Sequence, residues 1–285
     1  MVTYFSRIGA VLVACSAMAV AHAQDRIVSL GGDVTEIVYA LGAGDRIVAT
    51  DTTSVYPLKA LATPKVGYVR QLSAEGVLSV DPDLILISGA AGPETTLEQI
   101  RGTGVAIVEM ETAYTIEAIK EKTRKVAEAI GDTAAGEELV AQIEADWTTA
   151  LEKINSYEDG HDMLFFATFG DNAPRAAGRD TAAHGVIELI GGNNVFGSET
   201  GYKSLSLEAA VAADPDIILV MDMNAVSAGG VEELINHPAI SLTTAAQTRQ
   251  VFEVDAVRAM QFSPRTPKAI EELADKIEAQ LSADG

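Results

Sequence analysis

Two stretches of this 285-residue sequence nearly repeat each other: LSAEGVLSVDPDLILI at residues 72–87 and LSLEAAVAADPDIILV at residues 205–220. Eight of their sixteen positions are identical. In each copy a serine can cap a short helix, a glutamate falls in its first turn, and Asp-Pro-Asp ends it. A continuous apolar run follows, as expected for a strand that is buried on both faces. The chain therefore contains two halves built in the same way.

The sequence around each copy alternates short β-branched runs with helical patterns, which is typical of an α/β domain with a parallel sheet. We expect strands at 26–30, 46–50, 84–88, 105–108, 163–167, 217–220 and 251–254, and helices at 34–41, 184–190 and 267–281. The stretch from 116 to 154 is helical and free of strands. The predicted fold is α/β, with two similar lobes that have central, mostly parallel sheets and are joined by one long helix. A ligand cleft is expected between the lobes.

The expected domain boundaries follow from this pattern. The first α/β lobe is predicted at residues 24–130, the connecting helix at 131–157 and the second α/β lobe at 158–285. A single stiff helix between two lobes favours hinge bending of small amplitude over wide closure.

The first 23 residues have the pattern of a signal peptide. Arg7 provides a positive start, residues 8–21 are apolar, and Ala21-His22-Ala23 is a small-x-small cleavage site. Cleavage after Ala23 would release the protein into the periplasm. Cys15 offers an alternative, because residues 12–15 also resemble a lipoprotein cleavage box and lipidation there would tether the protein to a membrane.

Composition narrows the function further. The net charge of −21 argues against a nucleic-acid partner. The sequence lacks a Gly-x-Ser-x-Gly elbow and a phosphate-binding Gly-Lys-Ser/Thr loop, and its only cysteine is Cys15, so an exported enzyme is a remote alternative. A direct zinc or manganese binder would need several histidines at ligand spacing, whereas His161, His184 and His237 are scattered.

The repeated glutamates, Glu75 and Glu208, allow two interpretations. Each can simply stabilise the start of a helix, where the helix dipole favours a carboxylate. Alternatively, the two form a pair of exposed anchors, one per lobe, that engage basic residues of a two-fold symmetric partner. Physical reasoning alone leaves both open.

The signal peptide, the two α/β lobes, the long connecting helix and the paired glutamates resemble the class III substrate-binding proteins of ABC importers, which carry cobalamin, siderophores or haem. The segment Gly67-Tyr-Val-Arg-Gln-Leu-Ser-Ala-Glu-Gly76 is similar to the signature of the periplasmic haemin-binding branch. Residues 177–181 (AGRDT) and 263–267 (SPRTP) also resemble segments of that branch. The resemblance covers nearly the whole chain after the signal peptide.

The resemblance implies a function and roles for particular residues. The protein would capture haem in the periplasm through Tyr68 as axial ligand of the iron. Glu75 and Glu208 would dock on the permease dimer in the inner membrane, and an outer-membrane haem receptor would act upstream. The alternative on the same fold is capture of a ferric siderophore or cobalamin.

The chemistry of the motif agrees with this expectation. A tyrosinate oxygen is a hard anionic donor suited to ferric iron, and a neighbouring cation such as Arg70 would favour the ionised phenol or pair with a haem propionate. Further candidates for a cationic rim are Arg179, Lys203 and Arg258. Candidates for lining the cleft are Tyr202, which occupies the place of Tyr68 in the second copy of the repeat, and Met260 and Phe262.

We expect one haem per protein. Some relatives bind a second haem through a histidine of the second lobe, near the strand that precedes the Ala-Gly-Arg segment. The corresponding stretch here, residues 169–175 (FGDNAPR), contains no histidine.

Overall fold

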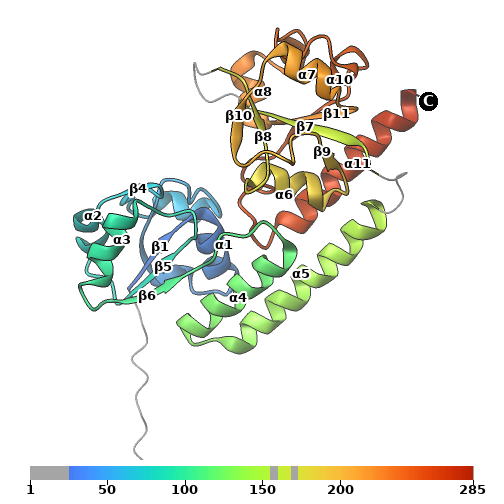
Figure 1. Cartoon of the computed structure of the whole chain (residues 1–285). Coiled ribbons are helices and arrows are strands. Elements are labelled where there is room, and N and C mark those ends of the chain that lie inside the picture. Colours follow the sequence, from blue (N-terminus) through green and yellow to red (C-terminus); the bar gives the residue numbers. More distant parts are fainter. Residues whose placement is uncertain (1–25, 155–159, 168–172, 285) are drawn as a thin grey trace, which may run out of the picture.

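The computed structural model describes residues 26–154, 160–167 and 173–284 of the chain. They form two α/β lobes joined by long helices (Figure 1). The predicted signal peptide, its cleavage site at Ala23 and the alternative lipidation site at Cys15 lie outside the described residues.

The first lobe is built on a parallel sheet with strand order β2-β1-β5-β6. The strands are β1 (Ile27–Leu30), β2 (Ile47–Thr50), β5 (Leu84–Ile87) and β6 (Ala106–Glu109). The helices are α1 (Gly32–Ala40), α2 (Ala74–Leu78), α3 (Glu94–Arg101) and α4 (Ile116–Ile130). These bounds confirm the strands and the first helix that the sequence pattern predicts for this half.

The continuous apolar run of the first repeat copy becomes the strand β5, which is buried on both faces. Leu84 and Leu86 point into a core shared with α1 and α4, whereas Ile85 and Ile87 point into a core on the opposite face of the sheet. Successive side chains of a strand point to opposite faces of the sheet. Because both faces of this sheet are covered, all four side chains of β5 must be apolar, as they are.

The second lobe repeats this plan and adds antiparallel strands at one edge. Its main strand order is β10-β8-β7-β11-β12, and β9 pairs with β7. The strands are β7 (Asp162–Ala167), β8 (Arg175–Ala177), β9 (Asn193–Asn194), β10 (Tyr202–Ser204), β11 (Ile217–Met221) and β12 (Val251–Val254). The helices are α6 (Ala182–Leu189), α7 (Leu207–Ala213), α8 (Asp222–Ala228), α9 (Val231–Ile235) and α10 (Thr244–Gln247). Strand β11, from the second repeat copy, is again buried at every position.

The two repeat copies fold as their sequences predict. The Ser73 hydroxyl accepts a hydrogen bond from the amide of residue 76 at the start of α2, and the Ser206 hydroxyl accepts one from residue 209 at the start of α7. The Asp-Pro-Asp segments follow both helices, directly after α7 and two residues beyond the end of α2 at Leu78. Their first aspartates, Asp81 and Asp214, take the left-handed φ values of 51° and 35° that short polar side chains tolerate best.

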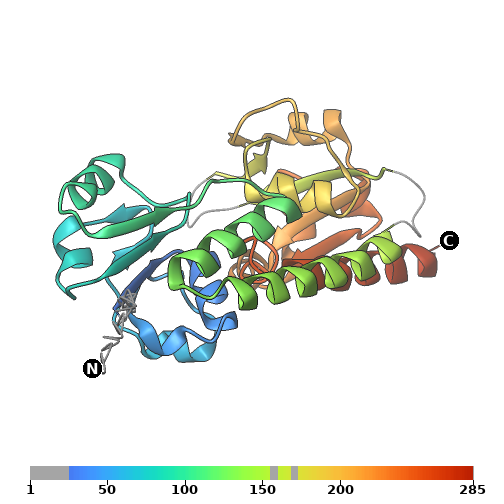
Figure 2. The same cartoon turned by 90° about the horizontal axis from the view of Figure 1, so that it is seen from below.

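The connection between the lobes is broader than the single helix that the sequence pattern suggests. Helix α4 is followed by Gly131 in a left-handed conformation, and α5 (Thr133–Ile154) then runs back along α4 toward the second lobe. The closing helix α11 (Thr266–Asp284) packs along α5, as Figure 2 shows from below. Residues 155–157 of the predicted connecting helix lie outside the described residues.

Helix α4 also contributes to both lobes. Its first turns place Ile116 and Ile119 in the core of the second lobe, and its last turns place Val126 and Ile130 in that of the first. Three packed helices, with one of them shared between the cores, resist bending more than one isolated helix does. Within the described part of the chain, no helix has the length and apolar character needed to cross a membrane.

The burial of β5 on both faces leads to a stability prediction. Replacing Ile85, which is fully buried, with Ala should lower the free energy of unfolding by about 2–5 kcal/mol, because a cavity opens under α2 and α3. Urea denaturation measures the loss. The matched control is Ile107→Ala on the edge strand β6, where the side chain is only partly buried and the loss should be smaller. Equal losses at the two positions would contradict the assignment of β5 as the central core strand.

Candidate functional site

Two neighbouring hollows lie between the lobes, and the first lobe provides the floor of one of them, the main cleft. The floor consists of the loops that follow the carboxyl ends of the parallel strands: residues 31–33 after β1, Thr53 after β2, residues 88–90 after β5 and residues 111–114 after β6. This is the edge at which open parallel sheets bind ligands, because the loops of neighbouring strands converge there.

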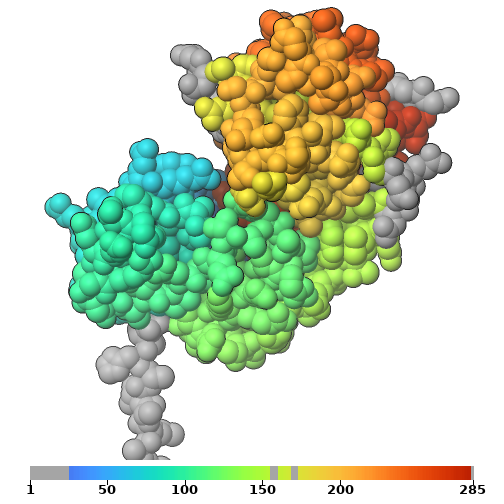
Figure 3. Space-filling model, viewed as in Figure 1, coloured from blue at the N-terminus to red at the C-terminus, as the bar shows by residue number. Residues whose placement is uncertain are grey.

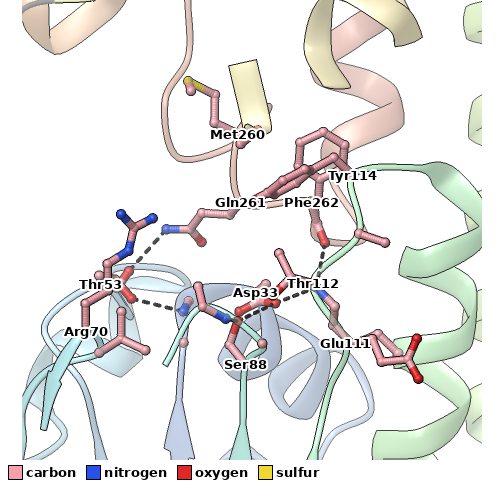
Figure 4. Close-up of a pocket in the computed structure, with 18 of the residues that line it drawn as sticks. Asp33, Thr53, Arg70, Ser88, Glu111, Thr112, Tyr114, Met260, Gln261 and Phe262 are labelled. Atoms are coloured by element: carbon pink, nitrogen blue, oxygen red, sulfur yellow. Dashed lines mark hydrogen bonds and ion pairs between the residues drawn. The ribbon is translucent and has the colours of Figure 1, made fainter. Parts of the chain in front are cut away.

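The opposite wall comes from the second lobe. Met260, Gln261 and Phe262, in the loop between β12 and α11, face the floor across the cleft (Figure 4). The cleft has a cavity volume of about 190 Å³ and is open to solvent. The space-filling view shows the indentation between the two lobes (Figure 3).

Tyr68 and Arg70 both line this cleft. They lie on a tight hairpin of β3 (Gly67–Tyr68) and β4 (Gln71–Leu72). Tyr68 pairs with Gln71 across the hairpin, and Arg70 occupies its turn. Gly67 has a φ of 118°, which a residue with a side chain rarely adopts.

The Tyr68 side chain is accessible to a ligand, with 42% of its surface exposed. Arg70 is also exposed and forms no ion pair with any carboxylate among residues 26–154, 160–167 and 173–284. The hairpin therefore presents a phenol and an available guanidinium to the same cleft.

Two further tyrosines, Tyr114 and Tyr202, lie close to Arg70. Burial raises the pKa of both phenols, and the nearby Arg70 guanidinium offsets part of the shift in each. Both side chains therefore stay neutral at physiological pH. Tyr114 packs edge-to-face against Phe262, with ring centroids 5.1 Å apart, and so extends the apolar wall.

A buried ion pair lies at the floor of the cleft. The Lys122 ammonium contacts the Asp33 carboxylate, and both side chains are more than nine-tenths buried. Asp33 also accepts a hydrogen bond of 3.1 Å from the Ser88 hydroxyl, and Lys122 donates one of 3.3 Å to the Phe262 carbonyl. Since the Lys122 charge is already balanced, Arg70 is the better partner for an anionic ligand in this cleft.

The structure brings only some of the predicted site residues together. Tyr68, Arg70, Met260 and Phe262 line the cleft, and Tyr202 lies near Arg70. The three other predicted cations, Arg179, Lys203 and Arg258, do not line it.

Each of these three cations has partners elsewhere. Arg179 lines a neighbouring hollow and donates to the Ser198 carbonyl at 2.6 Å, while Lys203 lies 3.9 Å from a Glu199 carboxylate oxygen. Arg258 donates to both Glu272 oxygens at 2.6 and 2.7 Å. Its charge is thus engaged within its own lobe, which makes the predicted role in binding a propionate unfavourable.

The sequence pattern did not predict four further residues that line the cleft: Tyr114, Gln261, Asp33 and Lys122. A usable signal existed for Asp33 and Tyr114, because both follow predicted strands of a parallel sheet, where ligand-binding loops lie. Lys122 sits in the middle of a helix and Gln261 in an irregular loop, so only the tertiary structure reveals them. Among the described residues, no group of three His, Cys, Asp or Glu side chains could hold a metal ion. Residues 168–172, which include part of the histidine-free stretch, lie outside the description.

Comparison with known proteins assigns the chain to a family. The sequence profile of the family described as periplasmic binding protein matches residues 27–257, which is most of both lobes. The chain belongs to the periplasmic binding protein family. It is a periplasmic substrate-binding protein of an ABC importer, with the two-lobed fold of class III.

Solved structures of haem-binding proteins are similar to this binding protein. The periplasmic heme-binding protein RhuT from Roseiflexus sp. RS-1, in its apo form, is 36% identical with a TM-score of 0.84, over 90% of this chain and 99% of that one. The periplasmic heme-binding protein BhuT in complex with two hemes is 34% identical with a TM-score of 0.85, over 90% and 98%.

A curated relative has a different ligand. The vitamin B12-binding protein of Vibrio cholerae is 27% identical over 271 residues, which are 92% of this chain and 95% of that protein. The family is therefore established, and the choice between haem and a corrinoid depends on the residues of the cleft.

The buried pair of Lys122 and Asp33 leads to a second prediction. Lys122→Met leaves the Asp33 carboxylate buried without its cation and should lower the free energy of unfolding by about 3–5 kcal/mol. Chemical denaturation measures the loss. The control is Lys122→Met combined with Asp33→Asn, which removes both charges and should recover most of the stability. A double variant as unstable as the single one would refute the explanation by an unpaired charge.

Proposed function

We propose that this binding protein captures haem in the cleft between its lobes, with the Tyr68 oxygen as axial ligand of ferric iron, and delivers it to the permease of an ABC importer. The observation that carries the proposal is that Tyr68 and Arg70 line the same cleft from one exposed hairpin. Haem-binding proteins with more than 30% identity and nearly complete coverage support it.

The three tyrosines near the cleft differ in a way that favours Tyr68. Tyr114 and Tyr202 are partly buried, which raises their pKa and keeps them protonated. Tyr68 is more exposed, at the tip of a hairpin, where a planar ligand can approach its oxygen. Ferric iron supplies the positive charge that stabilises a tyrosinate once it is bound.

Arg70 would serve the same ligand. Its guanidinium lines the cleft without a carboxylate partner in the described part of the chain, so it can stabilise the ionised Tyr68 oxygen or pair with a haem propionate. In a protein with a net charge of −21, such a local cation is required before an anionic ligand can bind. The apolar wall of Met260, Phe262 and Tyr114 would pack against the porphyrin face.

Delivery would use the two repeat helices. Glu75 and Glu208 are exposed in the first turns of α2 and α7. Figure 1 shows these helices at the outer ends of the two lobes. The pKa of Glu208 is lowered by hydrogen bonds from its own backbone amide and from the Ser206 hydroxyl, so this carboxylate is charged at neutral pH. One carboxylate per lobe matches a two-fold symmetric permease, whose docking would spread the lobes and loosen the iron bond.

We further propose one haem per protein, because residues 169–175 contain no histidine that could hold a second iron. The similar protein BhuT has been solved with two hemes, so the stoichiometry is a sharp test. Trp147 is the only tryptophan of the chain and packs against the core of the second lobe. Quenching of its fluorescence by added hemin therefore counts the haem molecules bound. Saturation at two equivalents would contradict the proposal.

The role of Tyr68 is tested by Tyr68→Phe, which removes the oxygen and keeps the ring. We expect at least about a hundredfold weaker hemin binding and loss of the ferric-tyrosinate absorption, since the only protein bond to the iron is lost. Tyr39→Phe is the control, because Tyr39 packs against the core of the first lobe and does not line the cleft. A Tyr68→Phe protein with an unchanged spectrum would remove Tyr68 from the site.

Competition between ligands tests the substrate class in the same assay. Hemin should bind and produce the tyrosinate spectrum, whereas cobalamin and a ferric siderophore should not displace it at equimolar concentration. Tight binding of cobalamin with no response to hemin would instead favour the vitamin B12 branch of the family.

Docking is tested by reversing both anchor charges with Glu75→Lys and Glu208→Lys. Haem affinity should be unchanged, because neither residue lines the cleft, whereas haem-dependent growth or transport into vesicles that contain the permease should be abolished. The matched control is Glu94→Lys combined with Glu233→Lys, which reverses one exposed charge per lobe on other helices. Normal uptake by the variant of the two anchors would refute the docking role.

A further inference from the structure

The loop that forms the second-lobe wall of the cleft contacts the first lobe at several points, and two buried carboxylates of helix α1 are central to these contacts. Asp33 and Glu36 lie one turn apart at the start of α1, and both are almost completely buried. Two carboxylates so close together on one buried helix face repel each other and need cations. Lys122 provides one of these cations and Arg265 provides the other.

Arg265 makes the stronger connection between the lobes. It immediately precedes α11 in the second lobe, and its Nε and Nη2 donate to the two Glu36 carboxylate oxygens at 2.8 and 2.6 Å. Its guanidinium also lies 3.5 Å from the centroid of the Tyr56 ring, which belongs to the first lobe. One side chain thus combines a bidentate ion pair with a cation–π contact, an arrangement that a lysine cannot reproduce.

Lys122 and Gln261 hold the same loop at two further points. The Lys122 ammonium binds Asp33 and also donates to the Phe262 carbonyl of the opposite wall. The Gln261 amide donates to the Thr53 carbonyl at 3.2 Å. A side chain at Gly32 would overlap Gln261, because an added Cβ would lie 2.4 Å from its amide oxygen. The wall therefore rests directly on the backbone of the floor.

Hydrogen bonds within the loop between β12 and α11 stiffen it. The contacts with the first lobe therefore position the whole loop rather than single side chains. The Thr266 hydroxyl donates to the Arg258 carbonyl at 3.1 Å and accepts from the Ser263 amide at 3.0 Å, and both Ser263 and Thr266 are fully buried. Phe262 has a left-handed φ of 54°, which is unusual for an aromatic residue and directs its ring toward Tyr114. A bond made at Arg265 therefore determines where residues 260–262 stand.

We infer that Arg265 and Lys122 are positioning residues of the ligand cleft: by neutralising Glu36 and Asp33 on α1, they hold the wall of Met260–Phe262 at a set distance from Tyr68 before any ligand is bound. For its haem readout this inference rests on the proposed function. A cleft that is already formed requires no ordering of the wall when the ligand binds, so the bridge acts mainly by slowing ligand release.

The distance between the lobes tests the inference without any ligand. Spin labels are attached through Gln99→Cys on α3 and Val226→Cys on α8, two exposed positions in different lobes, with Cys15 replaced by Ser as the only native cysteine. Arg265→Gln should broaden the measured distance distribution and shift it to longer distances. The distance distribution of Arg265→Lys should lie between those of Arg265→Gln and of the protein with Arg265, since the charge is kept and the bidentate contact is lost.

The ligand readout separates positioning from a merely structural role. With Arg265→Gln, hemin should dissociate about tenfold faster, because one wall of the cleft is no longer held, while the tyrosinate absorption keeps its position, because the iron bond to Tyr68 is intact. Glu36→Gln should speed hemin dissociation to the same extent. The double variant should release hemin no faster than either single variant, since all three lose the same Arg265–Glu36 ion pair.

The matched control is Arg101→Gln. Arg101 makes an equally bidentate pair with Glu109 at 2.6 and 2.7 Å, but wholly within the first lobe. This control should leave both the distance distribution and the dissociation rate unchanged. An unaltered distance distribution in Arg265→Gln would overturn the inference whatever the ligand. Failure of the unmodified protein to bind hemin would refute the proposed function, but the distance test would still be valid.

Discussion

The cleft depends on one electrostatic constraint: two carboxylates buried on the first turns of α1 must each be met by a cation. Asp33 is met by Lys122 from α4, and Glu36 is met by Arg265 from the second lobe. Removing either cation would leave a charge in a buried site, which costs far more than an exposed ion pair contributes. The lobes are thus held together by charge matching at the point where the parallel strands end and the ligand site begins.

The same constraint gives the cleft its chemical character. Since Lys122 is occupied by Asp33, and Arg258 by Glu272, neither is available to an anionic ligand. Arg70 has no such partner among the described residues and stands beside Tyr68. Burial separates the tyrosines in a similar way, because it raises the pKa of Tyr114 and Tyr202, whereas the Tyr68 side chain on the hairpin is exposed. A strongly acidic protein can in this way offer one cationic, oxygen-donor site.

The fold could be predicted from the sequence where the residues needed for a strand or helix are also those needed for its place in the core. In β5 and β11 every side chain must be apolar because both faces are buried, so the strands stand out in a short segment. The serine caps of α2 and α7 are equally local.

The site was only partly predictable. Tyr68 and Arg70 belong to a contiguous motif, whereas Lys122, Gln261 and Arg265 acquire their roles from contacts across more than eighty residues of sequence. The ion pair of Arg258 with Glu272 could not be predicted in this way, because Glu272 lies on another element.

The central claim is a bond between the Tyr68 oxygen and ferric iron. Resonance Raman spectroscopy of the protein saturated with hemin tests it most directly, because excitation into the charge-transfer band enhances the vibrations of a coordinated phenolate ring. We expect phenolate modes that shift when tyrosine is supplied with a deuterated ring and that vanish in Tyr68→Phe. A complex that binds hemin with no phenolate modes, or that keeps them in Tyr68→Phe, would contradict the account.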